Sequence, residues 1–224
     1  MVLDLKGENE DPREILGAID SALRKREDLF GEINYISGAT FPVIKVVCTE
    51  AYHYKKLDIT VKDGRHYGIK CVELVNEYIG EYEGILRPLV YILKHLLNRA
   101  NLNDPYKGGI SSYSLILMLV SLLQWNIYFA KKKIGDIREN LGQMLLQFLS
   151  TYGNEFDPQK HEIRPNLPNI NDNNNPFEPI NPNFNSMYSM DYIVIRDPIN
   201  PENNVAKASG KFNVIKVNPE KLKF

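Results

Sequence analysis

The sequence has few of the residues that build metal or disulfide sites. It contains two cysteines, Cys48 and Cys71, and their separation matches no metal-binding or redox motif. Its four histidines are scattered and form neither an HExxH motif nor a His/Cys cluster. We therefore expect no zinc site, and the cysteine usage suits a reducing compartment.

An excess of charge of one sign is missing, and so is a long apolar run. Lysine and arginine number 27 against 28 acidic residues, which gives a formal net charge of −1. Any contact with RNA must therefore come from a local patch, for which the lysines at 131–133 are a candidate, although such a run is usually a solvated loop. The longest apolar stretch, residues 110–123, is shorter than the ~18 residues of a membrane span and contains serine. We expect a soluble intracellular protein with no membrane contact.

The first 65 residues predict a small α/β unit that looks incomplete. Residues 2–5 suit a short strand, and Asp11 followed by Pro12 is a typical helix start, with apolar spacing that continues to about residue 29. Extended segments should follow over residues 32–49 and 54–61. Alternation in the last strand groups its side chains by face: Leu57, Ile59 and Val61 on one side, Asp58 and Thr60 on the other.

Residues 66–165 predict a series of helices. The first spans 68–82, with an apolar stripe of Ile69, Val72, Val75, Ile79 and Tyr82. The second spans 86–99 and should be buried through Leu89, Ile92, Leu93, Leu96 and Leu97. Residues 110–123 are apolar on nearly every side and should form a helix buried all round. An amphipathic helix over 136–152 completes the set.

Two later segments carry little helical signal. Residues 166–187 are rich in Asn and Pro, and because they can bury so little we expect a mobile loop without chemistry of its own. Residues 192–196 are a short β-rich run, and residues 197–209 would be read, without other information, as a turn-rich loop.

The start of the buried helix, at residues 106–124, is the most unusual part of the chain. Gly108 and Gly109 form a turn before the helix, and Ser111 and Ser112 can cap its unpaired N–H groups. Tyr113 follows in the first turn. A flat ring beside hydroxyl groups and backbone donors at a helix N-terminus suits a base and its phosphates.

Residues 93–124 also carry a resemblance. They resemble the central-domain signature of the Trf-type noncanonical poly(A) polymerases, the terminal nucleotidyltransferases of nuclear RNA surveillance, which are related to DNA polymerase beta. The matching landmarks are Lys94, Leu102, Asn103, Gly108, Gly109, Ser112, Tyr113, Met118, Leu123 and Gln124. The resemblance implies an α+β fold, in which a partial nucleotidyltransferase sheet over 1–65 precedes a mainly helical domain over 66–224.

A second stretch resembles the nucleotide-recognition loop of the same family. In residues 197–209 the matching positions are Asp197, Pro198, Pro201, Asn203 and Val205, while Asn204, Ala206 and Lys207 replace the family's aspartate, glycine and arginine. In uridylyltransferase relatives the position of Asn203 carries histidine, which crowds out a purine. Asn203 leaves room for adenine and offers it a donor and an acceptor.

Asp58 has two readings. By pattern alone it is a solvent-facing residue on an edge strand; by resemblance it is the third catalytic carboxylate, which holds Mg²⁺ or Mn²⁺ and draws the proton from the RNA 3′-hydroxyl. The family's other two carboxylates form a D-x-D motif, and no such motif occurs in this chain. We therefore expect the sequence to begin inside a catalytic domain, and to be short at its C-terminus as well.

The resemblance implies transfer of AMP from ATP to RNA 3′ ends. Tyr113 would stack on the base, and Lys94 and Ser112 would hold phosphates. Gly68 belongs to the family's ribose-binding Asn-Gly pair, but here Tyr67 replaces the asparagine. The full set of implied nucleotide-binding residues is Gly68, Lys94, Gly109, Ser111, Ser112, Tyr113, Asp197, Asn200 and Asn203. Implied partners are a zinc-knuckle RNA-binding protein and an RNA helicase, as in TRAMP-like complexes, in the nucleoplasm or nucleolus.

Two alternatives remain open. Without D-x-D, the chain as written suits a nucleotide- or protein-binding fragment that does not catalyse. Uridylyl transfer is the other alternative, and Asn203 disfavours it.

Overall fold

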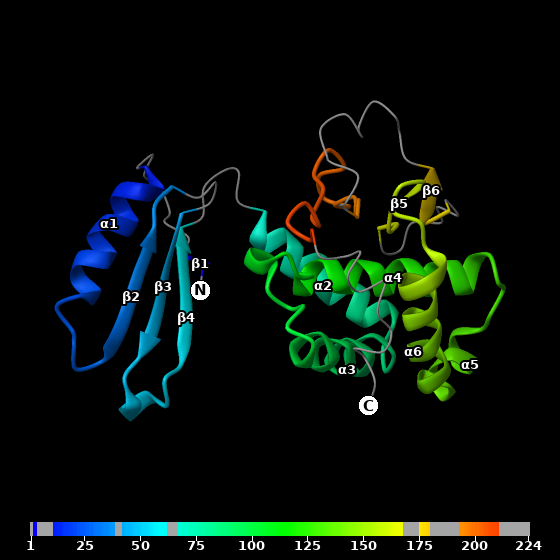
Figure 1. Cartoon of the computed structure of the whole chain (residues 1–224), viewed down its shortest axis with the longest axis horizontal. Helices are drawn as coiled ribbons and strands as arrows, with labels where there is room; N and C mark the ends of the chain where they lie inside the picture. The colour runs from blue at the N-terminus through cyan, green and yellow to red at the C-terminus, as the bar shows by residue number, and fades with distance from the viewer. Residues whose placement is uncertain are drawn as a thin grey trace. The chain divides into compact units, whose positions relative to one another are not determined.

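The structure is a computed structural model that describes residues 2–3, 11–38, 42–61, 67–167, 175–179 and 193–210 (Figure 1). The chain divides into two compact units, Met1–Val72 and Glu73–Phe224, here called the first and second units. Within the described ranges, no helix has the length and apolar character needed to cross a membrane.

The first unit is a four-stranded mixed sheet with one helix. Its strands are β1 (Val2–Leu3), β2 (Phe30–Ile36), β3 (Val43–Cys48) and β4 (Lys56–Val61), and a short 3-10 turn, Glu50–Tyr52, joins the last two. The strand order is β1-β4-β3-β2, in which β1 runs parallel to β4 and the other pairs are antiparallel.

Helix α1 (Pro12–Leu23) covers one face of this sheet (Figure 1). The Asp11 side chain accepts a hydrogen bond from the Arg13 N–H at 2.9 Å, so the predicted cap is confirmed. Alternate residues of β3 and β4 face the helix and form a core with Leu16, because strand side chains alternate between faces: Ile44, Val46, Ile59 and Val61.

Two expectations for the first unit are wrong in detail. The helix ends at Leu23 rather than near residue 29, and the chain turns through residues 24–29 before β2. Leu57 shares a strand face with Ile59 and Val61 by alternation, yet it is 41% exposed near the start of β4.

The second unit is mainly helical, as predicted. Its helices are α2 (Gly68–Glu81, whose first turn is counted with the first unit), α3 (Leu86–Arg99), α4 (Ser112–Tyr128), α5 (Ile134–Glu139) and α6 (Leu141–Ser150). A π-helical turn, Thr151–Glu155, extends α6. The single helix expected over 136–152 is therefore divided, because Asn140 leaves the helical conformation between α5 and α6.

Helix α4 is the centre of this unit. Eleven of its residues are buried, including polar Ser114, Ser121, Gln124 and Asn126, so the prediction of a helix buried all round is confirmed. The predicted apolar faces of α2 and α3 need correction: Val72 is 61% exposed and Ile92 is 46% exposed. In α2 the buried positions are Leu74 and Tyr78, while two members of the predicted stripe do face the core: Tyr82, just after the helix, is 1% exposed and Ile79 packs against that core.

A small hairpin and residues 193–210, here called the returning segment, complete the unit. Strand β5 (His161–Ile163) pairs antiparallel with β6 (Phe177–Pro179), and Ile195 joins Ile163 through a parallel bridge. Strand β6 lies within the predicted loop 166–187, so that expectation is wrong at these residues; 168–174 and 180–187 lie outside the described ranges.

Asn166, at the start of the same predicted loop, is also firmly held. Its N–H donates to Gln124 Oε1 at 2.9 Å, and its carbonyl oxygen accepts from Gln124 Nε2 at 2.9 Å and from the Tyr78 hydroxyl at 2.7 Å. The sheet of the first unit and the helices of the second make the chain an α+β protein.

Candidate nucleotide site

The site is built on the N-terminus of α4. Ser111 is the N-cap: its hydroxyl accepts from the Ser114 N–H at 3.0 Å and shares a 2.8 Å hydrogen bond with the Ser114 hydroxyl. Ser112 is the first helical residue and is exposed. Of the two predicted caps, only Ser111 caps the helix, and the Ser112 hydroxyl lies at the surface beside the positive end of the helix dipole.

Gly109 must be glycine for a reason of space. A Cβ atom on it would lie 2.4 Å from the Leu102 carbonyl oxygen and 2.8 Å from the Asp104 nitrogen. The close approach is fixed by backbone hydrogen bonds, Gly109 N–H to Asp104 O at 2.8 Å and Ile110 N–H to Leu102 O at 2.7 Å. The preceding Gly108 has a φ of +81°, which favours glycine for a different reason.

A hollow of about 360 Å³ opens beside this helix end. Among the residues that line it are Lys94 and His95 from α3 and Ser111 and Ser112 from α4, together with Asn103. None of its lining residues is acidic. A lysine, hydroxyl groups and a helix N-terminus around one hollow form an environment suited to an anion such as a phosphate.

Tyr113 is tied to the segment that returns from the end of the chain. Its hydroxyl donates to Asp197 Oδ1 at 3.1 Å, although the two residues are 84 positions apart in the sequence. Two further bonds close the same contact: Ser114 Oγ donates to the Val205 carbonyl at 3.2 Å, and Ser209 Oγ donates to the Gly109 carbonyl at 3.0 Å. The two stretches that the resemblance assigned to nucleotide binding therefore lie side by side.

Asp197 organises the returning segment. The residue is 4% exposed, and besides the Tyr113 hydroxyl it accepts from the Ile199 N–H at 3.0 Å and from Asn203 Nδ2 at 3.2 Å. The Asn203 N–H donates in turn to the Asn200 carbonyl at 2.8 Å. Asp197, Asn200 and Asn203 thus form one hydrogen-bonded turn, and Asp197 is a structural acceptor within it.

Behind this turn, two buried polar groups hold the segment in place. Asn204 is fully buried; its Oδ1 accepts from the Ile195 and Ala206 N–H groups, both at 3.0 Å, and its Nδ2 donates to the Ile193 carbonyl at 3.2 Å. Glu162 on β5 is also fully buried. It pairs with Arg196 at 2.9 Å and with Arg164.

The remaining predicted residues belong to the first unit. Asp58 on β4 is exposed and lies directly across the antiparallel ladder from Lys45 on β3. Gly68 begins α2, and Tyr67 before it has its ring 5.6 Å from the Lys70 ammonium group, which engages the aromatic face at the position where the family has asparagine.

A divalent metal would find only part of a site in the described ranges. Asp58 supplies one carboxylate of the type that Mg²⁺ or Mn²⁺ prefers. Among the residues that the structure describes, no group of three or more His, Cys, Asp or Glu side chains is placed to hold a metal. The described residues therefore do not form the two-metal site, and Asp58 can be at most one of its ligands.

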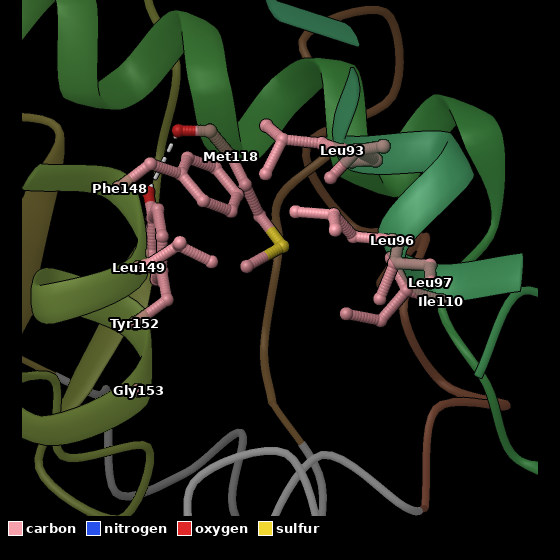
Figure 2. Close-up of a pocket in the computed structure, with 10 residues that line it drawn as sticks. Leu93, Leu96, Leu97, Ile110, Met118, Phe148, Leu149, Tyr152 and Gly153 are labelled. Atoms are coloured by element: carbon pink, nitrogen blue, oxygen red, sulfur yellow. Dashed lines mark hydrogen bonds between the residues drawn. The ribbon is translucent and has the colours of Figure 1, made fainter. Parts of the chain in front are cut away.

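An apolar cavity that shares Leu97, Ile110 and Leu115 with the hollow beside the start of α4 is a packing feature. It has a volume of about 40 Å³ and lies between α3, α4 and α6, with Met118 and Phe148 in its wall (Figure 2). Figure 2 also shows the Tyr152 hydroxyl hydrogen-bonded to the Met118 carbonyl, at 2.7 Å, so this polar group is already satisfied. A space of roughly one water molecule, with no polar group left to bind it, suits neither a nucleotide nor an ordered water.

Some residues of the site could not have been chosen from the sequence. Glu162 stands in a stretch without a motif, and Ser209 is not one of the matched positions of the predicted loop. Only the fold pairs Glu162 with Arg196 and Ser209 with Gly109. His95 shares the hollow with Lys94, and its position next to Lys94 in the sequence was the one available signal.

Comparisons with known proteins support the family resemblance. Residues 140–203 match the family model of the Cid1 family poly A polymerases. The poly(A) RNA polymerase cid14 of Schizosaccharomyces pombe is 36% identical over 59% of this chain and 18% of its own length. An inactive noncanonical poly(A) RNA polymerase of Drosophila melanogaster, Trf4-2, is 30% identical over 58% of this chain and 31% of its own length. The chain thus spans less than a third of either relative.

Solved structures extend the similarity to nearly the whole chain. The polymerase core of TRAMP, a RNA surveillance complex, superposes with a TM-score of 0.75 at 26% identity, over 95% of this chain and 64% of that one. The Cid1 poly(U) polymerase shares the fold, with a TM-score of 0.66 at 19% identity over 96% of this chain and 75% of that one. By sequence and by fold, the chain is therefore a relative of the Trf-type noncanonical poly(A) polymerases.

Proposed function

We propose that this chain provides the nucleotide-binding part of an enzyme that transfers AMP from ATP to RNA 3′ ends without a template. One observation carries the proposal. The Tyr113–Asp197 hydrogen bond joins the aromatic residue at the start of α4 to the predicted recognition loop, beside a hollow lined by Lys94 and Ser112. The domains would be a partial nucleotidyltransferase domain over 1–65 and a PAP-associated domain over 66–224.

Each predicted residue has a role in binding or shape. Tyr113 would stack on the base, with its ring held by the hydrogen bond from its hydroxyl to Asp197. Lys94 and Ser112 would hold the phosphates in the 360 Å³ hollow. Ser111 and Gly109 would act indirectly, since Ser111 caps α4 and Gly109 permits the tight turn before it.

Base selection is assigned to Asn203, while Asp197 and Asn200 shape the turn that presents it. One amide hydrogen of Asn203 is used by Asp197, and the Oδ1 acceptor and second hydrogen give the side chain the capacity to pair with an adenine edge. Gly68, at the start of α2, would lie near the ribose.

Catalysis would require more metal-binding carboxylates than Asp58, which is the one assigned among the described residues. A divalent ion, when bound, would stabilise the negative charge that develops on the phosphates. Asp58 would be one ligand and would accept the proton of the RNA 3′-hydroxyl, in a protein that supplies the remaining ligands. RNA, ATP and Mg²⁺ or Mn²⁺ are the proposed substrates and metal, in the nucleus, with zinc-knuckle and helicase partners as in TRAMP-like complexes.

A binding module without catalysis is the second candidate. Two observations support it: the Drosophila relative is named as inactive, and Asp58 is the one described carboxylate that is assigned to the metal. Both candidates share the nucleotide site, so they differ in turnover and not in binding. Uridylyl transfer is less favoured because Asn203 replaces the histidine of those relatives.

Nucleotide binding tests the proposal directly. Equilibrium dialysis with labelled ATP and UTP should show that Tyr113→Ala weakens both nucleotides roughly tenfold, because stacking on an aromatic ring tolerates every base. Tyr113→Phe should lose less, since it keeps the ring and removes only the bond to Asp197. Asn203→His should move the affinity ratio from ATP toward UTP.

The matched control is Tyr52→Ala, which removes a half-exposed tyrosine from the first unit. It should leave both affinities unchanged. Equal effects of Tyr52→Ala and Tyr113→Ala would contradict the site, and an unchanged ATP/UTP ratio in Asn203→His would contradict the recognition loop.

Turnover is a separate prediction. The purified chain should incorporate no AMP into RNA, because one carboxylate cannot hold two metal ions. The measurement is gel analysis of an end-labelled RNA incubated with ATP and Mg²⁺ or Mn²⁺. Efficient tailing would show that the remaining metal ligands have been misplaced.

A further inference from the structure

A second hollow of the second unit lies where the end of α4 meets α6 and the β5–β6 hairpin. Its volume is about 330 Å³, within the ~300–1,000 Å³ range of ligand sites. Four aromatic side chains line it, Trp125, Phe156, His161 and Phe177, together with the polar residues Gln147 and Glu155. None of these belongs to the predicted nucleotide set.

The aromatic wall is built like a stacking surface. The rings of Phe156 and Phe177 have centroids 6.1 Å apart at 55°, and those of Phe156 and His161 lie 6.4 Å apart at 48°. Phe156 and Phe177 also pack against Tyr152 of the core, with centroids 5.8 and 6.2 Å away, whereas Trp125, His161 and Phe177 are half-buried and line the hollow. Flat rings around a hollow of this size suit a flat ligand.

Polar groups in the same hollow could pair with the edge of such a ligand. The Glu155 carboxylate accepts one hydrogen bond, from the Ser150 hydroxyl at 2.8 Å, and a carboxylate has the capacity for several. Gln147 Oε1 accepts from Lys132 Nζ at 3.2 Å. A nucleobase, which is flat and carries donors and acceptors on its edge, fits this combination.

The Gln147–Lys132 bond also connects the hollow to the basic run at 131–133. Lys131 and Lys133 are exposed on either side of Lys132. Cations after the C-terminus of α4 stabilise the helix dipole, which accounts for a positive charge there. Stabilisation of the helix dipole does not require three lysines. It also does not explain why Lys132 is bonded to Gln147, a residue that lines the aromatic hollow.

We propose that this hollow and residues 131–133 form an accessory site for single-stranded RNA, in which one base enters the aromatic hollow and the lysines contact neighbouring phosphates. Aromatic stacking combined with a cationic track is the usual design of sequence-tolerant single-strand binding. The proposal rests on the proposed function, since it supplies a second hold on the same RNA whose 3′ end would be extended.

Trp125 provides a direct reporter, because it is the chain's only tryptophan. Titration of the full chain with a twelve-nucleotide oligo(A) should quench its intrinsic fluorescence as a base stacks in the hollow. Inorganic polyphosphate of matching charge, which has no bases, should leave the fluorescence largely unchanged. ATP alone should do the same, since its proposed site is the α4 N-terminus.

Variants separate the two parts of the site. Lys131→Ala with Lys133→Ala should weaken oligo(A) binding and lower the slope of log affinity against log salt by about 1.4, at ~0.7 for each phosphate contact. The matched control is Lys25→Ala with Lys55→Ala, two exposed lysines of the first unit, which should change neither quantity. Phe177→Ala, with Trp125 retained as reporter, should weaken oligo(A) roughly tenfold.

Absence of quenching by oligo(A) would overturn the proposal, and is the result expected if the hollow serves a protein partner. Equal quenching by polyphosphate, or equal effects of the two lysine pairs, would overturn it too. In either case, ATP binding that still depends on Tyr113 would leave the proposed function intact. If Tyr113→Ala did not weaken ATP binding while oligo(A) still quenched Trp125, the result would count against the proposed function alone.

Discussion

At the scale of single residues, the candidate nucleotide site depends on close approaches that tolerate no extra atom. Gly109 is the clearest case, since the nearest atoms to an added Cβ all belong to backbone and cannot rotate away. By contrast, a Cβ at Gly80, an exposed position in α2, would meet nothing within 4 Å.

Gly109→Ala should therefore destabilise the second unit by roughly 1–3 kcal/mol and displace the start of α4. Gly80→Ala should stabilise the same unit by about 0.5–1 kcal/mol, because alanine is the better helix former. Urea unfolding followed by Trp125 fluorescence measures both. A Gly109→Ala protein as stable as the wild type would show that the turn between residues 102 and 110 can relax.

At the scale of elements, the sequence predicted features that depend on neighbouring residues and missed the contacts between residues far apart in the chain. The buried character of α4 follows from its composition, and the cap at Asp11 from two neighbouring residues, so both were predictable. The returning segment 193–210 is held by long-range partners, among them Glu162, and no periodicity encodes such pairs. The candidate site was predicted in part through resemblance to a family, whereas the bonds that assemble it came from the structure.

The buried Glu162–Arg196 pair makes this dependence measurable. Glu162→Ala should cost about 3–5 kcal/mol of unfolding free energy, because it leaves Arg196 buried without its counter-charge. Lys160→Ala, which removes a largely exposed partner of Asp157 in the same unit, should cost no more than about 1 kcal/mol. If both substitutions cost the same by urea unfolding, the pair does not hold the returning segment.

At the scale of the whole molecule, buried tyrosines should make the stability of the second unit depend on pH in the alkaline range. Burial raises the pKa of the Tyr78, Tyr82 and Tyr152 hydroxyls above the usual tyrosine value near 10. In the unfolded chain these groups ionise near pH 10, while in the folded chain they stay protonated. Stability should therefore be fully present below about pH 10 and fall above it, as the unfolded state gives up protons that the native state retains.

The expected slope is up to about 1.4 kcal/mol per pH unit for each of the three tyrosines. Urea unfolding between pH 8 and 11, with tyrosinate absorbance recorded in parallel, measures it. Tyr78→Phe removes one titrating group and should make the decline shallower, although it also loses the bond to Asn166. A flat profile above pH 10 would show that these hydroxyls reach solvent in the native state.

The contact between the start of α4 and residues 197–209 has a consequence for synthesis on the ribosome. Helix α4 and its cap are complete early, yet Asp197 and Ser209, which close the site around Tyr113 and Gly109, are translated some 80–100 positions later. On the proposed assignment, a nascent chain therefore exposes an aromatic helix start without its recognition loop, and it could not select a base until residues 197–209 had been translated. A nucleotide bound at the proposed site would stabilise the fold only after this contact has formed, and not its precursors.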